Sequence, residues 1–117
     1  MGKCISILGS TGSIGTQSLE VAKAHDMQVH ALAANRNITL LEQQTREYHP
    51  KKVCIFEESQ YQELKQRLAD LPVQVLCGMD GLCDIAADKN ADILINSVVG
   101  LSLITHLRAH ETLRYLV

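Results

Sequence analysis

The chain has 117 residues, enough for one domain with its own hydrophobic core, so we expect a single domain over residues 1–117. Charged residues make up 21% of the sequence and sum to a net charge of −2, with acidic and basic residues interspersed. This composition argues against a nucleic-acid partner, and no apolar run approaches the roughly 18 residues that a membrane-spanning helix needs.

Short apolar runs alternate with amphipathic stretches along the whole chain. Residues 4–8 are almost continuously apolar, as in a strand buried on both faces, and apolar residues at helical spacing follow over 13–24. Further strands are predicted over 29–34, 53–56, 73–77 and 91–96, and further helices over 38–48, 59–69, 81–87 and 101–109. Thr39 and Glu42 fit a capping box near the start of the second helix, and His49–Pro50 ends that helix. Five β-α units in succession predict an α/β fold, a Rossmann-like doubly wound parallel sheet in a single domain.

The first loop of this fold is rich in glycine. The segment ILGSTGSIG places three glycines at intervals of three residues, between the first strand and the first helix. In an open parallel sheet, ligands bind outside the carboxyl ends of the strands, and a helix N-terminus attracts phosphate. Because glycine lets the backbone approach a ligand closely, the turn predicts a dinucleotide site. The predicted contacts are Gly9, Ser10, Thr11, Gly12 and Ser13, and the hydroxyl groups of the two serines and the threonine add donors without much bulk.

The spacing of these glycines is GxxGxxG, which differs from the commoner GxGxxG fingerprint, so a purely structural turn is the alternative. Gly15, the third glycine, is expected to let the first helix pack closely on the sheet.

The second loop predicts which dinucleotide binds. An NAD-selective site usually has Asp or Glu about 20 residues after the glycines, to hold the ribose 2′-hydroxyl. Here the segment holds Asn35, Arg36 and Asn37, with no carboxylate. A guanidinium pairs with a 2′-phosphate, so we expect NADP(H) rather than NAD(H). In the alternative interpretation, Arg36 is a solvated loop residue and Asn37 only caps the second helix.

The segment NSVVG ends the fifth predicted strand. We expect this segment, residues 96–100, to lie close to the nicotinamide end of an extended cofactor, because small or apolar side chains there let a flat ring lie against the backbone. An ordinary strand-to-helix turn is the alternative.

Other patterns predict no chemistry in this chain. Tyr61 and Lys65 have the YxxxK spacing of short-chain dehydrogenases, but on the helix after the third strand, which is too early for that family. His106 and His110 are four residues apart without a third ligand, so we predict no metal site. The sequence shows no Ser-His-Asp set and no P-loop lysine, and we predict no catalytic residue in this chain. The remaining histidines are expected on the surface or in loops: His25, His30 and His49.

The four cysteines form no CxxC pair, and each lies in or beside an apolar segment. We expect them to be reduced thiols that act as small hydrophobic residues. Nothing at the amino terminus looks like a signal peptide, so a cytoplasmic location is expected.

The strings ILGSTGSIGTQSLEV, ALAANRNIT and INSVVGL, in this order, resemble the NADPH-binding domain of 1-deoxy-D-xylulose 5-phosphate reductoisomerases. The resemblance spans about residues 3–108. It implies an enzyme that rearranges 1-deoxy-D-xylulose 5-phosphate and reduces the product with NADPH to 2-C-methyl-D-erythritol 4-phosphate, in non-mevalonate isoprenoid biosynthesis. It also implies a divalent metal, Mg²⁺ or Mn²⁺, and a homodimer. The matching motifs imply that the cofactor phosphates contact Thr11, Gly12, Ser13 and Ile14, and that its 2′-phosphate end meets Asn35, Arg36 and Asn37. They also imply that Val99 and Gly100 lie toward the nicotinamide.

Two features depart from the pattern of that family. Asn35 stands where the family often has glycine, and asparagine is expected to tolerate a left-handed turn there. The tail AHETLRYLV does not match the expected continuation, in which the metal and substrate residues follow. We therefore expect a fragment of a longer enzyme that is inactive alone. The alternatives are the cofactor domain of another NADP-dependent dehydrogenase and a non-enzymatic nucleotide-binding module.

Overall fold

The structure is a computed structural model, and it describes residues 3–96 of the chain. In this range, five parallel strands form one sheet in the order β4-β3-β2-β1-β5. The strands are β1 (Cys4–Leu8), β2 (Gln28–Ala34), β3 (Lys52–Ile55), β4 (Gln74–Cys77) and β5 (Ile93–Asn96). The helices are α1 (Ser13–Ala24), α2 (Ile38–Tyr48), α3 (Tyr61–Arg67) and α4 (Gly78–Ala87), with a 3₁₀ turn over Glu58–Gln60. No helix within the described range is long and apolar enough to cross a membrane.

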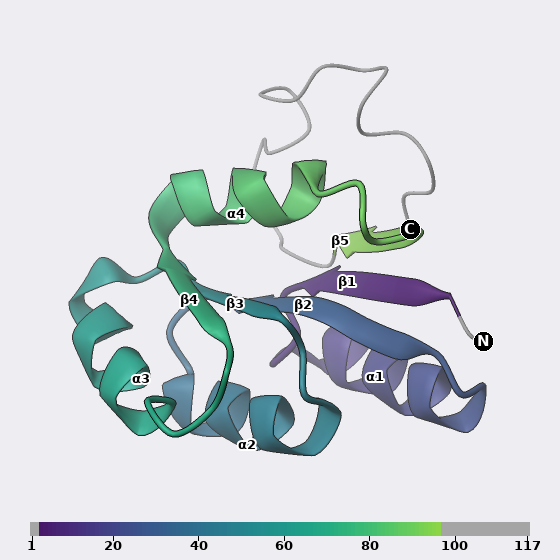
Figure 1. The fold of residues 1–117 in the computed structure, drawn as a ribbon, viewed down its shortest axis with the longest axis horizontal. Coiled ribbons are helices and arrows are strands. Elements are labelled where there is room, and N and C mark those ends of the chain that lie inside the picture. The colour runs from purple at the N-terminus through teal and green to yellow at the C-terminus, as the bar shows by residue number, and fades with distance from the viewer. Residues whose placement is uncertain (1–2, 97–117) are drawn as a thin grey trace.

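Helices cover both faces of the sheet (Figure 1). The chain steps from β1 to β4 in one direction, and α1, α2 and α3 lie on one face. It then returns across the sheet to place β5 beside β1, and α4 covers the opposite face. Right-handed crossovers require this change of face when the direction of travel reverses. The doubly wound α/β fold expected from the sequence is confirmed.

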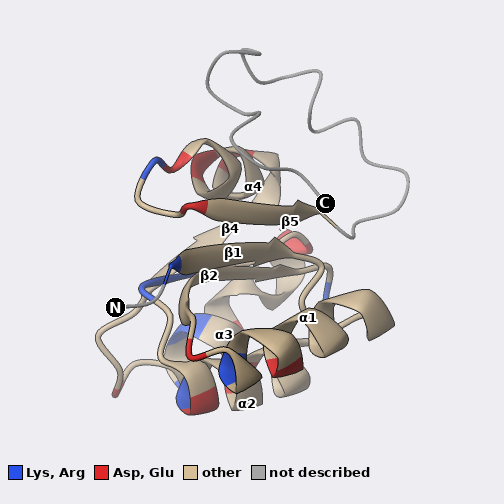
Figure 2. Cartoon of the chain, turned by 90° about the vertical axis from the view of Figure 1, so that its right-hand side faces the viewer, with Lys and Arg blue, Asp and Glu red and all other residues tan. Residues whose placement is uncertain are grey.

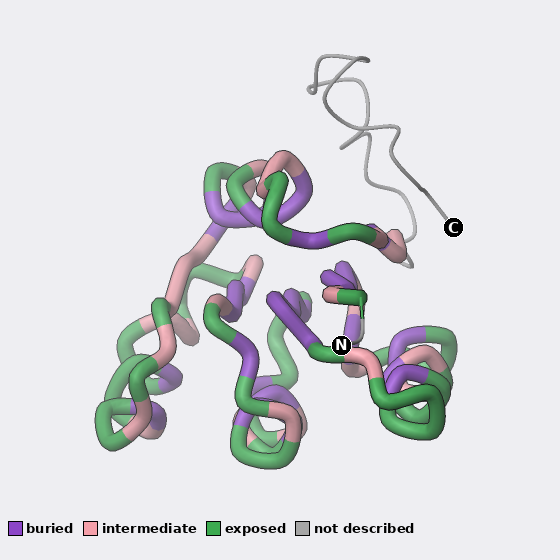
Figure 3. The backbone as a smooth tube through the Cα atoms, turned by 45° about the vertical axis from the view of Figure 1, so that its right-hand side comes forward, coloured by how far each residue is buried: buried purple, intermediate pink, exposed green. Residues whose placement is uncertain are grey.

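The core divides into two layers of different side-chain size. On the α1–α3 side, large side chains such as Leu32 and Ile55 pack against Leu41 of α2. On the α4 side, the central strands present small residues, Ala31 and Ala33 among them. Buried residues accordingly follow the strands and the inner faces of the helices, as Figure 3 shows. Small residues beneath α4 allow this helix to cross several strands at close range.

The four cysteines are free thiols. Cys54 is fully buried beneath α4, and burial raises the pKa of its thiol to about 12. The other three are partly buried. Cys54 therefore behaves as a small hydrophobic residue and not as a nucleophile, because nucleophilic attack requires the thiolate.

The expected boundaries of β1, α1 and α2 agree with the structure, and those of the later elements shift. The helix expected over 59–69 is a 3₁₀ turn followed by α3, and α4 begins at Gly78, earlier than the expected residue 81. Glycines near position 80 concealed this start, because glycine has low helix propensity and packing on the sheet overrides it. The helix expected over 101–109 lies outside the described residues.

The predicted capping box at α2 is wrong. The N-cap is Asn37, whose Oδ1 accepts a hydrogen bond from the Leu40 N–H at 3.1 Å. Thr39 already lies inside the first turn of the helix. Asparagine at the N-cap satisfies one of the N–H groups that a helix leaves free at its start.

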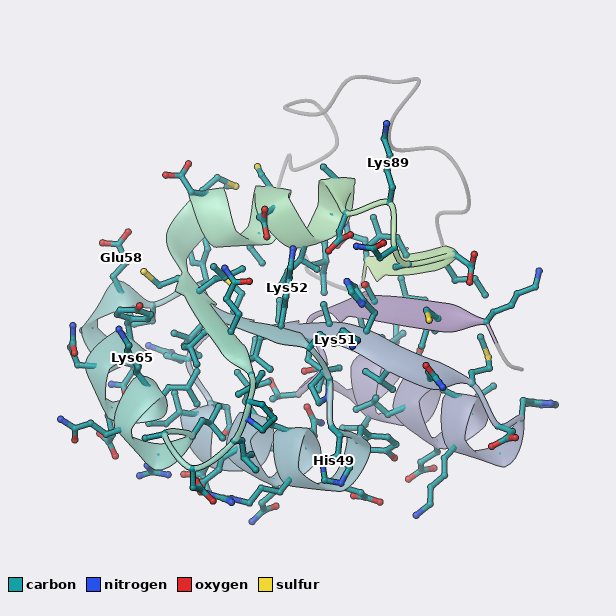
Figure 4. All side chains as sticks on the ribbon, viewed as in Figure 1. His49, Lys51, Lys52, Glu58, Lys65 and Lys89 are labelled. Atoms are coloured by element: carbon teal, nitrogen blue, oxygen red, sulfur yellow. The ribbon has the colours of Figure 1, made fainter. Side chains whose placement is uncertain are left out.

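His30 was expected at the surface, and this expectation is also wrong. The pairing of β1 with β2 skips His30, and its side chain is buried with 6% exposure. Its Nε2 lies 2.8 Å from Asp88 Oδ2, and the same carboxylate oxygen is 2.8 Å from Lys52 Nζ. Figure 4 shows Lys52 pointing from β3 toward α4. A carboxylate only accepts hydrogen bonds, so the Nε2 of His30 carries the proton in this contact.

Replacing Asp88 with asparagine is expected to lower the free energy of unfolding at pH 7 by about 1–3 kcal/mol, because Lys52 and His30 lose a charged acceptor. Burial favours a raised pKa for Asp88, but hydrogen bonds from Lys52, the Asn90 N–H and His30 outweigh it and hold the pKa well below its usual range. The charged form therefore stabilises the fold above about pH 4, and this contribution disappears as the pH falls through the lowered pKa. Urea unfolding between pH 7 and pH 2 should show a steeper loss of stability for the wild type than for Asp88→Asn. Equal slopes would contradict the prediction.

Candidate functional site

Two loops of the described chain meet at the carboxyl edge of the sheet. Leu8, the last residue of β1, pairs with Ala33 of β2 and with Asn96 of β5. The loops that follow β1 and β2 therefore start at the same level, and the end of β5 lies at that level on the other side of β1. The strand order reverses at β1, since β2 and β5 are reached by crossovers on opposite faces. In open α/β sheets, ligands bind at such a reversal.

The turn after β1 is tied to the end of β2. The backbone N–H groups of Gly9 and Ser10 both donate to the carbonyl oxygen of Ala33, at 2.7 and 2.8 Å. Gly9 has a φ of +87°, in the region where side chains other than glycine are strained. The first glycine thus allows the chain to bend sharply out of the sheet.

Glycine is required at position 15 because the backbone of α1 there lies very close to the turn that follows β1. A Cβ atom at Gly15 would lie 2.1 Å from the carbonyl oxygen of Gly9 and 2.6 Å from the Cα of Ser10. At Gly15, α1 therefore packs against the turn that precedes it, whereas the sequence predicted close packing against the sheet.

Gly12 differs from Gly15, because the described fold does not require its lack of a side chain. Its φ of −81° is ordinary, and a Cβ atom there would meet only the Gly9 carbonyl oxygen, at 3.6 Å. Gly12 is the N-cap of α1, yet no side chain caps the helix. Because a Cβ atom would make only this one ordinary contact, the start of the helix is not crowded at Gly12.

The first turn of α1 presents free donors. No described residue accepts a hydrogen bond from the backbone N–H groups of Ser13, Ile14 or Gly15. The first turn has no acidic residue, and Figure 2 shows no charge along the beginning of this helix. Gly12, Ser13 and Ile14 are exposed. Free N–H groups at the positive end of a helix dipole suit an anion such as a diphosphate.

Ser10 and Thr11 differ from the exposed part of the turn. Ser10 is fully buried, so its hydroxyl lies beneath the surface of the turn, whereas Thr11 is partly exposed. The carbonyl oxygen of Ser10 accepts a hydrogen bond from Gln44 Nε2 of α2, at 2.8 Å. The sequence reasoning did not single out Gln44, although a glutamine three residues after Leu41 on the apolar face of a helix is a signal that it has a buried partner.

The loop after β2 carries the three residues predicted for the 2′-phosphate, and all three are exposed. The guanidinium of Arg36 forms no hydrogen bond or ion pair with a described residue, so it is available to a ligand. Asn37 caps α2 with its side chain, as one of the two interpretations expected.

The left-handed angle considered for Asn35 is absent, since its φ is not positive. Asn35 instead holds the next loop, because its carbonyl oxygen accepts the Glu57 N–H at 2.8 Å.

The profile of the 1-deoxy-D-xylulose 5-phosphate reductoisomerase family matches residues 5–114 of the chain. The chain belongs to this family. The reductoisomerase of Lachnoclostridium phytofermentans is 56% identical over 100 residues, which cover 85% of this chain and 26% of that protein. That of Agathobacter rectalis is 48% identical over 100 residues, which cover 85% of this chain and 26% of that protein. The chain thus spans about a quarter of the length of these curated relatives.

Solved reductoisomerase structures share the fold. A structure of the enzyme in complex with magnesium superposes with a TM-score of 0.81 at 33% identity, over 86% of this chain and 26% of that one. The Zymomonas mobilis reductoisomerase in complex with NADPH superposes with a TM-score of 0.80 at 32% identity, over 86% of this chain and 27% of that one.

The family membership decides against another type of dehydrogenase, one of the alternatives raised by the sequence. Tyr61 and Lys65, which have the spacing of a short-chain dehydrogenase pair, lie on α3, where the lysine Nζ is 5.6 Å from the tyrosine ring centroid. This is a cation–π contact along one helix face. Val99 and Gly100, expected near the nicotinamide in a reductoisomerase, lie outside the described residues, as do His106 and His110.

Within residues 3–96, no group of three His, Cys, Asp or Glu side chains is placed to hold a metal ion. The described part of this chain therefore does not fit the magnesium that a solved relative contains.

Proposed function

We propose that this chain binds NADPH at the carboxyl edge of its sheet. The diphosphate would contact the turn formed by Gly9, Ser10, Thr11, Gly12, Ser13 and Ile14, and the 2′-phosphate would contact Asn35, Arg36 and Asn37. Val99 and Gly100 would lie toward the nicotinamide. The observation that carries the proposal is the start of α1. No described residue accepts a hydrogen bond from its first N–H groups, Gly12 has no crowded contact, and its first turn has no acidic residue.

The described residues fit this cofactor in charge as well as in shape. The N–H groups of Ser13 and Ile14 would hold the phosphates, and the guanidinium of Arg36, which pairs with no residue of the described range, would hold the 2′-phosphate with paired hydrogen bonds. NADPH, when bound, supplies a hydride to the reaction. This chain's own residues then bind and orient the cofactor, and none of the described residues is assigned a role in proton transfer or bond cleavage.

We further propose that the whole protein is an NADP-dependent reductoisomerase, acting on 1-deoxy-D-xylulose 5-phosphate and releasing 2-C-methyl-D-erythritol 4-phosphate for isoprenoid biosynthesis. The family membership supports this proposal. So do the relatives solved with NADPH, fosmidomycin and magnesium. A divalent metal, Mg²⁺ or Mn²⁺, a homodimeric assembly and a cytoplasmic location belong to the same proposal. The 117-residue chain alone is expected to bind the cofactor without turnover.

Calorimetric titration of the 117-residue chain tests the binding proposal. We expect NADPH to bind at least about tenfold more tightly than NADH, because one charged hydrogen bond contributes about 1.5–3 kcal/mol. Equal affinity for the two nucleotides would remove the 2′-phosphate assignment. No association of either at millimolar concentration would remove the proposed site altogether.

A further inference from the structure

Gln44 connects α2 to the phosphate-binding turn. Its side chain is buried, with 5% exposure, and its Nε2 donates to the Ser10 carbonyl oxygen at 2.8 Å. The orientation of the amide follows from this contact, because a carbonyl oxygen only accepts. Gln44 Oε1 has no partner among the described residues, so the donor is the polar function that this side chain serves.

The position of Gln44 along α2 links the two loops of the site. The helix begins directly after the loop of Arg36, with Asn37 as its N-cap, and Gln44 follows about two turns later. On the outer side of the helix, Arg46 forms two hydrogen bonds to the Asp70 carboxylate, at 3.0 and 3.1 Å. The helix thus has the 2′-phosphate loop at its amino-terminal end, and its middle is hydrogen-bonded to the turn through Gln44.

We propose that Gln44 is a positioning residue, which sets the phosphate-binding turn at the correct distance from the Arg36 loop so that one 2′-phosphorylated dinucleotide contacts both. This inference rests on the proposed function. A ligand held at two places loses affinity when the places shift relative to each other, because it no longer satisfies both contacts at once. Without Gln44, no side chain of the described residues donates to the buried Ser10 carbonyl, and the turn is free to move toward another partner.

The test compares Gln44→Met with Thr45→Val. Methionine keeps the length of the side chain and removes the donor. Thr45 is equally buried on the same helix, and its Oγ1 donates to Leu41 O at 2.7 Å within α2, so valine there perturbs the helix without touching the turn. NADPH spans both loops, whereas 2′-AMP offers its phosphate to the Arg36 loop alone, and both are titrated against the 117-residue chain.

For Gln44→Met, we expect NADPH binding to weaken about tenfold, the effect of one lost hydrogen bond, and 2′-AMP binding to change by less than about twofold. Thr45→Val should leave both affinities within about twofold of the wild type. Amide hydrogen exchange should accelerate at Ser10, Thr11 and Gly12 in the glutamine variant only. Gln44→Asn, which is one methylene too short to reach the carbonyl, should show the same pattern if the methionine variant does not fold.

The outcomes separate this inference from the proposed function. If the wild type binds NADPH but Gln44→Met binds it equally well, the inference fails. It also fails if Thr45→Val loses as much affinity, or if the glutamine variants lose 2′-AMP as strongly as NADPH. If the wild type binds no NADPH, the proposed function fails. In that case hydrogen exchange still tests the positioning role of Gln44. Unchanged exchange rates at Ser10, Thr11 and Gly12 in the glutamine variants would overturn it.

Discussion

Arg36→Ala is expected to weaken NADPH binding about 10- to 150-fold and to leave NADH binding within about threefold. The range follows from a charged hydrogen bond of about 1.5–3 kcal/mol, at one decade of affinity per 1.4 kcal/mol. The guanidinium is exposed and makes no ion pair with a described residue, so its loss should not affect folding. Isothermal titration with both nucleotides measures the effect.

Lys51→Ala is the matched control for this prediction. Lys51 is also exposed, but it precedes β3 at the amino edge of the sheet, opposite the site (Figure 4). Its removal changes the net charge by the same amount, so it reports any general electrostatic effect on a highly charged ligand. The assignment of Arg36 is lost if both substitutions weaken NADPH alike, or if Arg36→Ala weakens NADPH and NADH alike.

Gly15→Ala is expected to destabilise the chain by about 1–3 kcal/mol or more, the usual cost of overpacking. The new Cβ atom would lie 2.1 Å from the Gly9 carbonyl oxygen, so α1 and the turn must separate. The better helix propensity of alanine, worth about 1 kcal/mol, offsets only part of this cost. Chemical denaturation followed by circular dichroism measures the loss.

Gly12→Ala provides the contrast within the same turn. Its Cβ atom would have ordinary contact with the Gly9 carbonyl oxygen at 3.6 Å, and its φ suits alanine. We expect the stability to change by about 1 kcal/mol at most, since alanine is a poorer N-cap than glycine, and NADPH binding to weaken roughly tenfold or more. A Gly12 variant that binds NADPH normally would show that the space in front of α1 is not used by the cofactor.

Much of this protein could be predicted from local pattern. The apolar run of β1, the helical spacing of α1 and the alternation of strands and helices predict a doubly wound sheet, because both sides of a parallel strand are buried and each crossover needs a helix. The glycine turn and the absence of a carboxylate at Asn35, Arg36 and Asn37 predict an NADPH site, which stays a prediction, whereas the family match confirms the resemblance on which it also rests. These signals lie within one segment each, so a single sequence contains them.

The contacts between segments were decided only by the tertiary structure. The burial of His30 with Asp88 joins residues 58 positions apart, and Gln44 meets Ser10 across 34 positions. The separate roles of Gly12 and Gly15 likewise depend on where α1 lies against the turn. A polar side chain has the same local pattern whether it faces solvent or a buried carbonyl. Its role depends on which element packs over it, and this follows from the summed burial of the whole core rather than from its neighbours in the chain.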